Sequence, residues 1–299
     1  MPGFLSPLIE PGFFSNLPVQ TALVVGGVVA VVSGIVGTFT VMRGQSFAGH
    51  SLADIGTAGG SAAFVLGISP LFGFVAMNLM AAGVMEWIGI RRPRGRDLAT
   101  GIVLGAALGL AALFLYLDTT ASSTTGATVN VLFGSIFTLP ASMVPFIAIF
   151  SVVAAGIVLV MYRPLILTSV SADLAIAQGI RVRLVGIGYL VALALAVSLS
   201  AVTIGAILST ALLIGPAATA LRITNRTGRA AVIAAGIGII ATWLGVLLAY
   251  DSYYWFPNGG GWPVSFFVVT LIFLVYLLSQ LRFRGHSAAR RRSTAAQAG

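Results

Sequence analysis

The sequence predicts an all-α fold, a polytopic bundle of transmembrane helices, on the basis of three observations. Hydrophobic residues make up 58% of the 299 residues and charged residues only 8%, whereas a soluble domain carries about 25% charged residues. The apolar residues form continuous runs and not the alternating ten-residue stretches of a membrane β-barrel. Since one transmembrane helix needs roughly 20 apolar residues, the chain has room for about nine spans joined by short loops.

The predicted spans follow one another along the chain and are separated by charged, proline-containing or glycine-rich segments. Their ranges are 19–42, 51–68, 70–90, 98–117, 140–162, two spans within 184–221, 230–249 and 264–281. The run 184–221 contains no charged residue, and as one helix it would be about 57 Å long, which is too long for a bilayer core. We therefore expect a turn near residues 198–203.

Four segments between or after the spans have characters of their own. Residues 131–139 are apolar but too short to cross the membrane, which favours a re-entrant or interfacial helix. Residues 118–130 form a polar loop rich in serine and threonine, and residues 250–263 an aromatic, glycine-rich loop. We interpret residues 1–281 as a single transmembrane domain and the basic residues 282–299 as a disordered cytoplasmic tail.

The arginines predict the orientation of the chain in the membrane. All sixteen basic residues are arginine, and every one falls on the same side of an alternation of nine spans, in the segments at 43, 91–96, 163–183, 222–229 and 282–292. The opposite side carries only the acidic residues Glu10, Asp118 and Asp251. Because the positive side is cytoplasmic, we expect the N-terminus outside and the C-terminus inside. The basic charge thus reports topology and does not indicate a nucleic-acid partner.

Several kinds of active site are excluded by the residues that the sequence lacks. Without cysteine there is no disulfide framework, and without lysine there is no nucleotide-binding P-loop. The H-E-x-x-H and G-x-S-x-G patterns of zinc proteases and serine hydrolases are also missing from the sequence. We therefore expect a protein that is not an enzyme and binds no permanent cofactor.

Ionisable residues at membrane depth are functional candidates, because charge is costly there. His50 and Asp54 lie four residues apart at the start of the second span, which places them on one helical face. Imidazole and carboxylate are both ligands of divalent metals; the alternative is a hydrogen-bonded pair that only fixes helix packing. For Glu86 we expect an ion pair with Arg91 or Arg92, and for Asn78 an interhelical hydrogen bond.

Glycines at small-x-x-x-small spacing occur in two of the predicted spans. Gly56 and Gly60 lie in the second span, and Gly101, Gly105 and Gly109 lie on one face of the fourth. Such stripes favour close packing between helices, although hinges for a moving transporter remain the alternative.

Three stretches together resemble the permeases of the manganese/zinc/iron-chelate ABC importer family, over about residues 19–281. The first is RGQSFAGHSLADIGTAGG at 43–60, the second is SADLAIAQG at 171–179, and the third is VTIGAILSTALLIGPAATA at 202–220. Leu132-Phe133-Gly134 also fits the family. One departure concerns the candidate ligands, since the family carries aspartate first and histidine four residues later, whereas this sequence has the reverse order.

The resemblance implies roles for two groups of residues. His50 and Asp54 would line the metal route within the membrane. Asp173, Leu174, Ala175 and Gly179 would belong to a coupling helix, within a loop at about 164–183, that inserts into an ATPase subunit. Independently of the family, Ser171 or Asp173 can cap such a helix and Gly179 can end it, which predicts a helix of five or six residues with Leu174 and Ile176 available to dock.

The sequence thus predicts the permease subunit of a bacterial ABC importer, located in the cytoplasmic membrane among its lipids, for a divalent metal: zinc or manganese first, iron next. The resemblance implies a second permease copy, ATPase subunits that bind the ATP, and an extracytoplasmic metal-binding protein. Two alternatives stay open, an ABC permease for a metal chelate such as a siderophore and a secondary transporter or channel that works without ATP. Which metal is carried is not fixed by the sequence.

Overall fold

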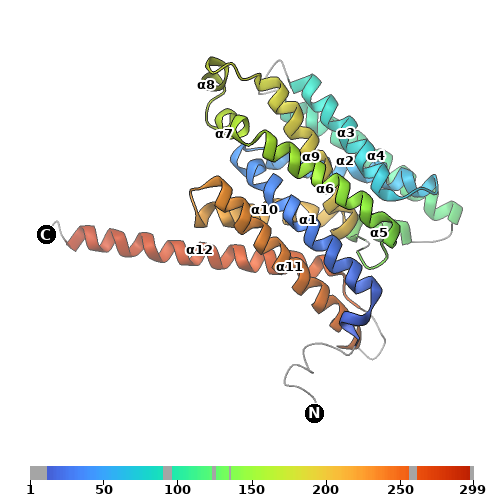
Figure 1. Ribbon diagram of the computed structural model, residues 1–299. Coiled ribbons are helices and arrows are strands. Elements are labelled where there is room, and N and C mark those ends of the chain that lie inside the picture. Colours follow the sequence, from blue (N-terminus) through green and yellow to red (C-terminus); the bar gives the residue numbers. More distant parts are fainter. Residues whose placement is uncertain (1–11, 90–95, 123–125, 135, 256–260, 297–299) are drawn as a thin grey trace, which may run out of the picture.

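The protein is described by a computed structural model, which covers residues 12–89, 96–122, 126–134, 136–255 and 261–296 (Figure 1). Over these ranges the chain is helical and contains no β-strand, which confirms the predicted all-α class. The helices are α1 (Leu17–Met42), α2 (Ser46–Val65), α3 (Pro70–Gly89), α4 (Arg96–Ser122), α5 (Gly126–Phe133), α6 (Val144–Val160), α7 (Tyr162–Val170), α8 (Ala172–Ala177), α9 (Val182–Ile204), α10 (Ala206–Ile223), α11 (Thr227–Trp255) and α12 (Val264–Ala296), with 3₁₀ turns at Phe13–Ser15 and Ala141–Met143.

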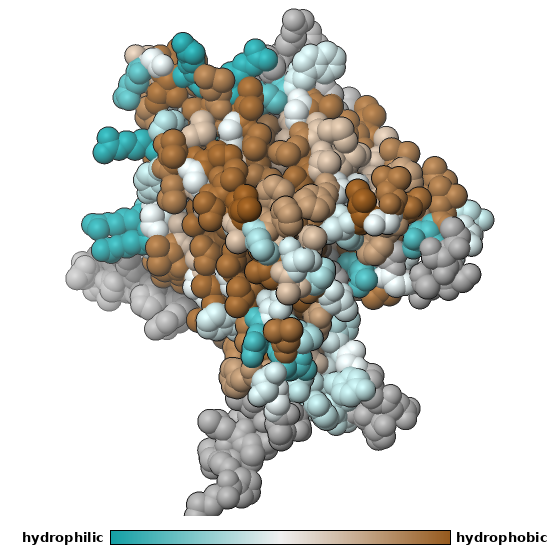
Figure 2. All heavy atoms as spheres, turned by 45° about the vertical axis from the view of Figure 1, so that its right-hand side comes forward, coloured by the Kyte–Doolittle hydropathy of each residue, from teal (hydrophilic) through white to brown (hydrophobic). Residues whose placement is uncertain are grey.

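Eight segments in the described part of the chain are helical, long and apolar enough to cross a membrane. They correspond to eight of the nine predicted spans; the ninth, α2, has 20 residues but is less apolar. Its glycine, serine and threonine residues, together with His50 and Asp54, account for the difference. Figure 2 shows apolar side chains covering most of the visible face, with strongly hydrophilic ones gathered mainly along its upper left edge.

The bundle has a buried centre and an apolar periphery. In the most apolar 18-residue stretch of α1 and of α9, 72% and 78% of the residues are buried, whereas the values for the spans that contain α4, α6 and α12 are 17%, 22% and 28%. A helix that is apolar on its exposed faces fits a lipid environment and not water. Figure 1 shows α7 and α8 at one end of the bundle and the beginning of α1 at the other.

The turn between α9 and α10 lies at Gly205, after the predicted region 198–203. Gly205 has a positive φ of 95°, and a Cβ atom there would clash with the carbonyl of Leu132. Gly134, with φ 86°, is the residue that faces this turn: a Cβ atom on it would clash with the backbone of the turn at Gly205. The close approach of two backbones therefore places the turn where both chains carry glycine.

The short helix α5 occupies Gly126–Phe133, earlier than the predicted segment 131–139. Its eight residues span about 12 Å, too little to cross the hydrocarbon core. The predicted polar loop 118–130 is largely helical, because α4 continues to Ser122 and α5 begins at Gly126. In α4, the hydroxyl groups of Thr119 and Thr120 donate to backbone carbonyls one turn earlier, so these two polar residues continue the helix with their hydroxyls paired.

Helices α11 and α12 also extend beyond their predicted ends. Helix α11 includes the first residues of the predicted aromatic loop 250–263, where Tyr250 and Tyr253 both contact the ring of Tyr254. Helix α12 runs to Ala296 and so includes most of the segment 282–299 for which the sequence predicts disorder. Alanine and arginine, which are frequent in that segment, have high helix propensity.

Helix α2 packs against α3 through small residues, as predicted for Gly56 and Gly60. A Cβ atom on Gly56 would lie 2.8 Å from the ring of Phe74, and one on Gly60 would approach the same ring even more closely. Asn78 of α3 donates a hydrogen bond of 2.9 Å to Ser198 of α9, which confirms the predicted interhelical bond. The glycines of α4 do not take part in such packing within the chain, since an added Cβ on Gly101, Gly105 or Gly109 would meet no atom within 4 Å.

Candidate functional site

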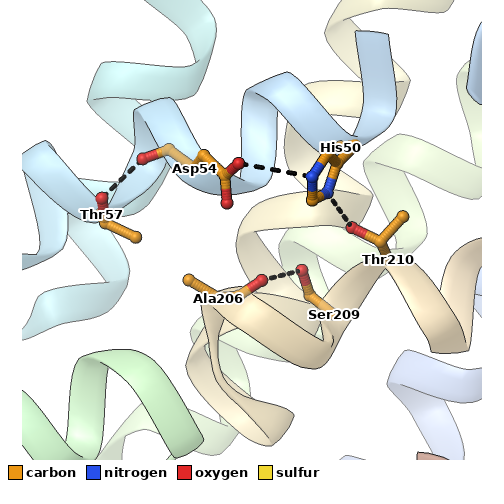
Figure 3. A network of polar contacts seen from close by, with 6 residues as sticks. All are labelled: His50, Asp54, Thr57, Ala206, Ser209 and Thr210. Atoms are coloured by element: carbon orange, nitrogen blue, oxygen red, sulfur yellow. Dashed lines mark hydrogen bonds and ion pairs between the residues drawn. The ribbon is translucent and has the colours of Figure 1, made fainter. Parts of the chain in front are cut away.

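His50 and Asp54 lie on one face of α2, one turn apart, as their spacing predicts (Figure 3). The distance between His50 Nε2 and Asp54 Oδ2 is 3.5 Å. The side chain of His50 is 50% exposed and that of Asp54 20% exposed. Both candidate donors are therefore brought together and remain reachable from outside the single chain.

The face of α2 with this pair lies against the beginning of α10. His50 Nδ1 is 3.2 Å from the hydroxyl oxygen of Thr210, which fixes the orientation of the ring (Figure 3). Two nearby hydroxyls bond to backbone: Thr57 donates to the carbonyl of Asp54 over 2.5 Å, and Ser209 donates to the carbonyl of Ala206 over 2.9 Å. The hydrogen bond from Thr57 ends on the main chain, so it leaves the carboxylate of Asp54 for other partners.

The pair supplies one nitrogen donor and one carboxylate to a metal ion. Within the described residues there is no group of three or more His, Cys, Asp or Glu side chains that could hold a metal. Divalent metals in proteins take four or more ligands. A metal at this position would complete its coordination with water or with donors from another chain.

The short helix predicted between Ser171 and Gly179 is present as α8, with the predicted ends. The hydroxyl oxygen of Ser171 accepts a hydrogen bond of 3.3 Å from the backbone N–H of Leu174, which makes Ser171, and not Asp173, the capping residue. At the other end Gly179 has φ 77°, and the N–H of Ile180 bonds to the carbonyl of Ala175 over 3.0 Å. This is a Schellman ending, for which glycine is the preferred residue.

The two faces of α8 differ in polarity and exposure. Ala175 is completely buried, whereas Leu174 and Ile176 are 55% and 62% exposed. Asp173 lies in the first turn, where the helix dipole favours a carboxylate. The helix therefore presents two apolar side chains to its surroundings, while Ala175 faces the rest of the protein.

The structure also contains a polar cluster that sequence reasoning missed. Arg43, which follows the last residue of α1, donates a hydrogen bond of 2.8 Å from its guanidinium to the hydroxyl of Thr168 in α7. The guanidinium also lies 5.0 Å from the ring centre of Tyr189 in α9. In the sequence, Arg43 marks the membrane side and begins the stretch 43–60 that resembles the family. Its contacts could not be predicted, because no local pattern relates residues separated by more than a hundred positions. The predicted ion pair of Glu86 with Arg91 or Arg92 lies outside the described residues.

Comparison with known proteins places these features in a family. The chain matches the ABC 3 transport family over residues 17–280. It is 27% identical to the manganese transport system membrane protein MntC of Listeria innocua, covering 92% of this chain and 93% of that protein. It is 30% identical to the manganese import system permease protein ScaB of Streptococcus pneumoniae, covering 78% of this chain and 81% of that one.

A solved structure agrees with the sequence relatives. The fold is similar to that of PsaBC from Streptococcus pneumoniae in complex with Fab, with a TM-score of 0.76 and 26% identity over 90% of this chain and 92% of that one. The chain therefore belongs to the ABC 3 transport family, and the resemblance found in the sequence is confirmed. It is a permease of the ABC transporter class and a multi-pass protein of the bacterial cytoplasmic membrane.

Proposed function

We propose that the chain moves a divalent metal ion, manganese first and zinc or iron next, into the cytoplasm past His50 and Asp54. The observation that carries this proposal is the pairing of the two donors on an open face of α2, with 3.5 Å between imidazole and carboxylate. It is supported by relatives whose names specify manganese transport. The reversed order of histidine and aspartate keeps both donors on one face and moves each by about one 5.4 Å turn.

The chemistry of the pair suits passage better than permanent binding. A carboxylate favours manganese and an imidazole favours zinc and iron, so a mixed pair accepts several first-row metals. A transport site needs affinity high enough for entry and low enough for release. Two protein donors from one chain, supplemented by water and by the same pair from a second permease copy, meet that requirement.

The energy for transport comes from a separate subunit in this proposal. The sequence has no lysine and hence no P-loop of its own. Helix α8 offers the exposed Leu174 and Ile176 as the apolar docking surface for an ATPase subunit. On the outer side, a soluble metal-binding protein would deliver the ion. The chain acts as a transport subunit, and ATP is hydrolysed on its partner.

Transport assays in vesicles test the proposal and separate it from its alternatives. Vesicles containing the permease, its ATPase and its binding protein should take up manganese when ATP is supplied, and a hydrolysis-deficient ATPase should abolish uptake. Uptake without ATP or without the ATPase would favour a secondary transporter or channel. Uptake of an intact metal chelate in preference to the bare ion would favour a chelate permease.

The orientation of the chain can be tested independently, because the sequence contains no cysteine. With the arginine-bearing segments in the cytoplasm, single cysteines at Thr120 and Gly261 should react with a membrane-impermeant thiol reagent applied from outside. Cysteines at Gln178 and Asn225 should react only after the membrane is opened. External labelling at Gln178 would overturn the proposed orientation and the placement of the ATPase.

A further inference from the structure

The corner between α1 and α2 is a rigid turn held by three backbone hydrogen bonds. Helix α1 ends in a Schellman motif, with the N–H of Gly44 bonded to Val41 over 3.1 Å and that of Gln45 bonded to Thr40 over 2.9 Å. Gly44 provides the positive φ of 64° that the motif requires. The carbonyl of Gln45 then accepts the N–H of Gly49 over 3.1 Å, so α2 begins directly from the turn. A movement of this corner therefore moves the beginning of α2.

Two other helices contact this corner through side chains. The guanidinium of Arg43 donates to Thr168 of α7 over 2.8 Å and lies over the ring of Tyr189 of α9. The hydroxyl of Tyr189, a fully buried residue, donates a hydrogen bond of 2.7 Å to the hydroxyl of Thr40 in the last turns of α1. We refer to these four residues, Thr40, Arg43, Thr168 and Tyr189, as the corner contact.

The corner contact lies between helix α8, the proposed docking site of the ATPase, and the proposed metal pair on α2. On one side, Thr168 is three residues before Ser171, which caps α8. The N–H of Ser171 bonds to Leu167 of α7 over 3.0 Å, so α7 and α8 are connected without a free linker. On the other side, Arg43 precedes His50 by seven residues, of which the last five belong to α2. The chain from the docking helix to the metal pair thus passes through helices and one rigid turn.

We propose that the corner contact transmits movement of α7 and α8 to the start of α2, and so couples ATP hydrolysis to the position of His50 and Asp54. This inference rests on the proposed function. Arg43, Thr168 and Tyr189 are positioning residues, since they contact neither the metal pair nor the docking face. Because arginine forms a planar, charged donor that both stacks on an aromatic ring and bonds a hydroxyl, it holds three helices with one side chain.

A second arginine–tyrosine pair provides a matched control. Arg222 at the end of α10 donates to the hydroxyl of Tyr276 in α12 over 3.1 Å, with its guanidinium 4.9 Å from the ring centre. As in the corner contact, a guanidinium lies over a tyrosine ring and donates to a hydroxyl, although here the hydroxyl is that of the same tyrosine. The pair connects α10 to α12 and touches neither α7 nor α2. If such pairs only stabilise the fold, loss of either one should have the same effect on transport.

The test measures metal uptake and ATP hydrolysis together in vesicles that contain the permease, its ATPase and its binding protein, with manganese as the metal. For Arg43→Gln and Thr168→Val we expect metal uptake per ATP hydrolysed to fall by about 5-fold or more, the lower range of allosteric couplings. Thr168→Ser keeps the hydroxyl and should retain the wild-type ratio, and so should Arg222→Gln. The double variant Arg43→Gln with Thr168→Val should be no worse than Arg43→Gln alone, because Arg43→Gln already removes the hydrogen bond to Thr168.

The possible outcomes separate this inference from the function on which it rests. A wild-type ratio in Thr168→Val, or an equal fall in Arg222→Gln, overturns the corner contact as a transmission element. A parallel loss of folded complex, uptake and hydrolysis, with no change in the ratio, shows a purely structural role and overturns it as well. If Arg43→Gln fails to assemble, the comparison of Thr168→Val with Thr168→Ser decides. Failure of the wild-type complex to import metal with ATP instead removes the proposed function itself.

Discussion

The two faces of α2 differ in how completely they are packed. Toward α3 the helix is closed: Gly59 and Gly73 face each other so closely that a Cβ on either would clash with the backbone of the other. On the face that carries the donor pair the packing is looser: His50 is half-exposed and bonded to a single hydroxyl of α10. The glycine face holds α2 in place, so the donors on the other face need few bonds of their own and stay available to a ligand.

This division also explains why α2 is the least typical of the predicted spans. A helix with glycine, serine, threonine, histidine and aspartate is poorly suited to contact lipid. The structure surrounds it with α3, α4, α9 and α10. The hydroxyl of Ser61 bonds within the helix to the carbonyl of Thr57 over 2.7 Å, so this polar group is satisfied by the helix itself. The amino-acid composition of α2 is therefore explained by its packing against neighbouring helices and by the donor pair that it carries, and not by contact with the bilayer.

The largest loss of folded protein is expected from placing a bulky side chain in the tight contact between α2 and α3. Gly59→Leu would force a side chain into the backbone of Gly73, and overpacking of this kind costs about 1–3 kcal/mol or more. We expect loss of most folded permease, measured as monodisperse yield and melting temperature in detergent. Gly83→Leu, in the neighbouring helix α3 and with open space around its Cβ, serves as the control and should fold normally. A normal yield of Gly59→Leu would show that the closed face does not position the helix.

A second effect should leave the fold intact but remove transport. Leu174→Asp places a charge on the exposed face of α8, where docking of the ATPase would have to desolvate it at a cost of several kcal/mol. We expect metal uptake to fall close to background while the permease still inserts. Ile223→Asp, an equally exposed position at the end of α10, should transport normally. Wild-type uptake by Leu174→Asp would remove α8 from the mechanism.

A smaller effect should follow from restoring the order of the family. The double variant His50→Asp with Asp54→His keeps one imidazole and one carboxylate on the open face and exchanges their positions over about one 5.4 Å turn. We expect substantial uptake with an altered preference between manganese and zinc, since the two donors favour different metals. Competition between the two metals in vesicles measures this shift. Complete loss of uptake in the folded double variant would show that the position of each donor matters more than the face.

Local signals in the sequence are sufficient to predict the long apolar helices, the ends of α8 and the common face of His50 and Asp54, but not the position of α5 or the far ends of α4, α11 and α12. Ser171 and Gly179 mark the ends of α8 by their own chemistry, and the spacing of His50 and Asp54 fixes their common face. Features that depend on distant contacts could not be predicted. The turn at Gly205 is set by the approach of Gly134, and the corner contact joins Arg43 to Tyr189, which is 146 positions later in the chain.

The most direct test of the central claim is metal uptake per folded permease in His50→Ala and Asp54→Ala. Ser61→Ala on the same helix is the control, because its hydroxyl bonds only to the backbone of α2. The account predicts that both variants assemble with the ATPase in near-normal amounts and lose nearly all manganese and zinc uptake, while Ser61→Ala transports normally. Folded alanine variants that transport like the wild type, or that lose uptake only in proportion to lost protein, would contradict a metal route past this pair.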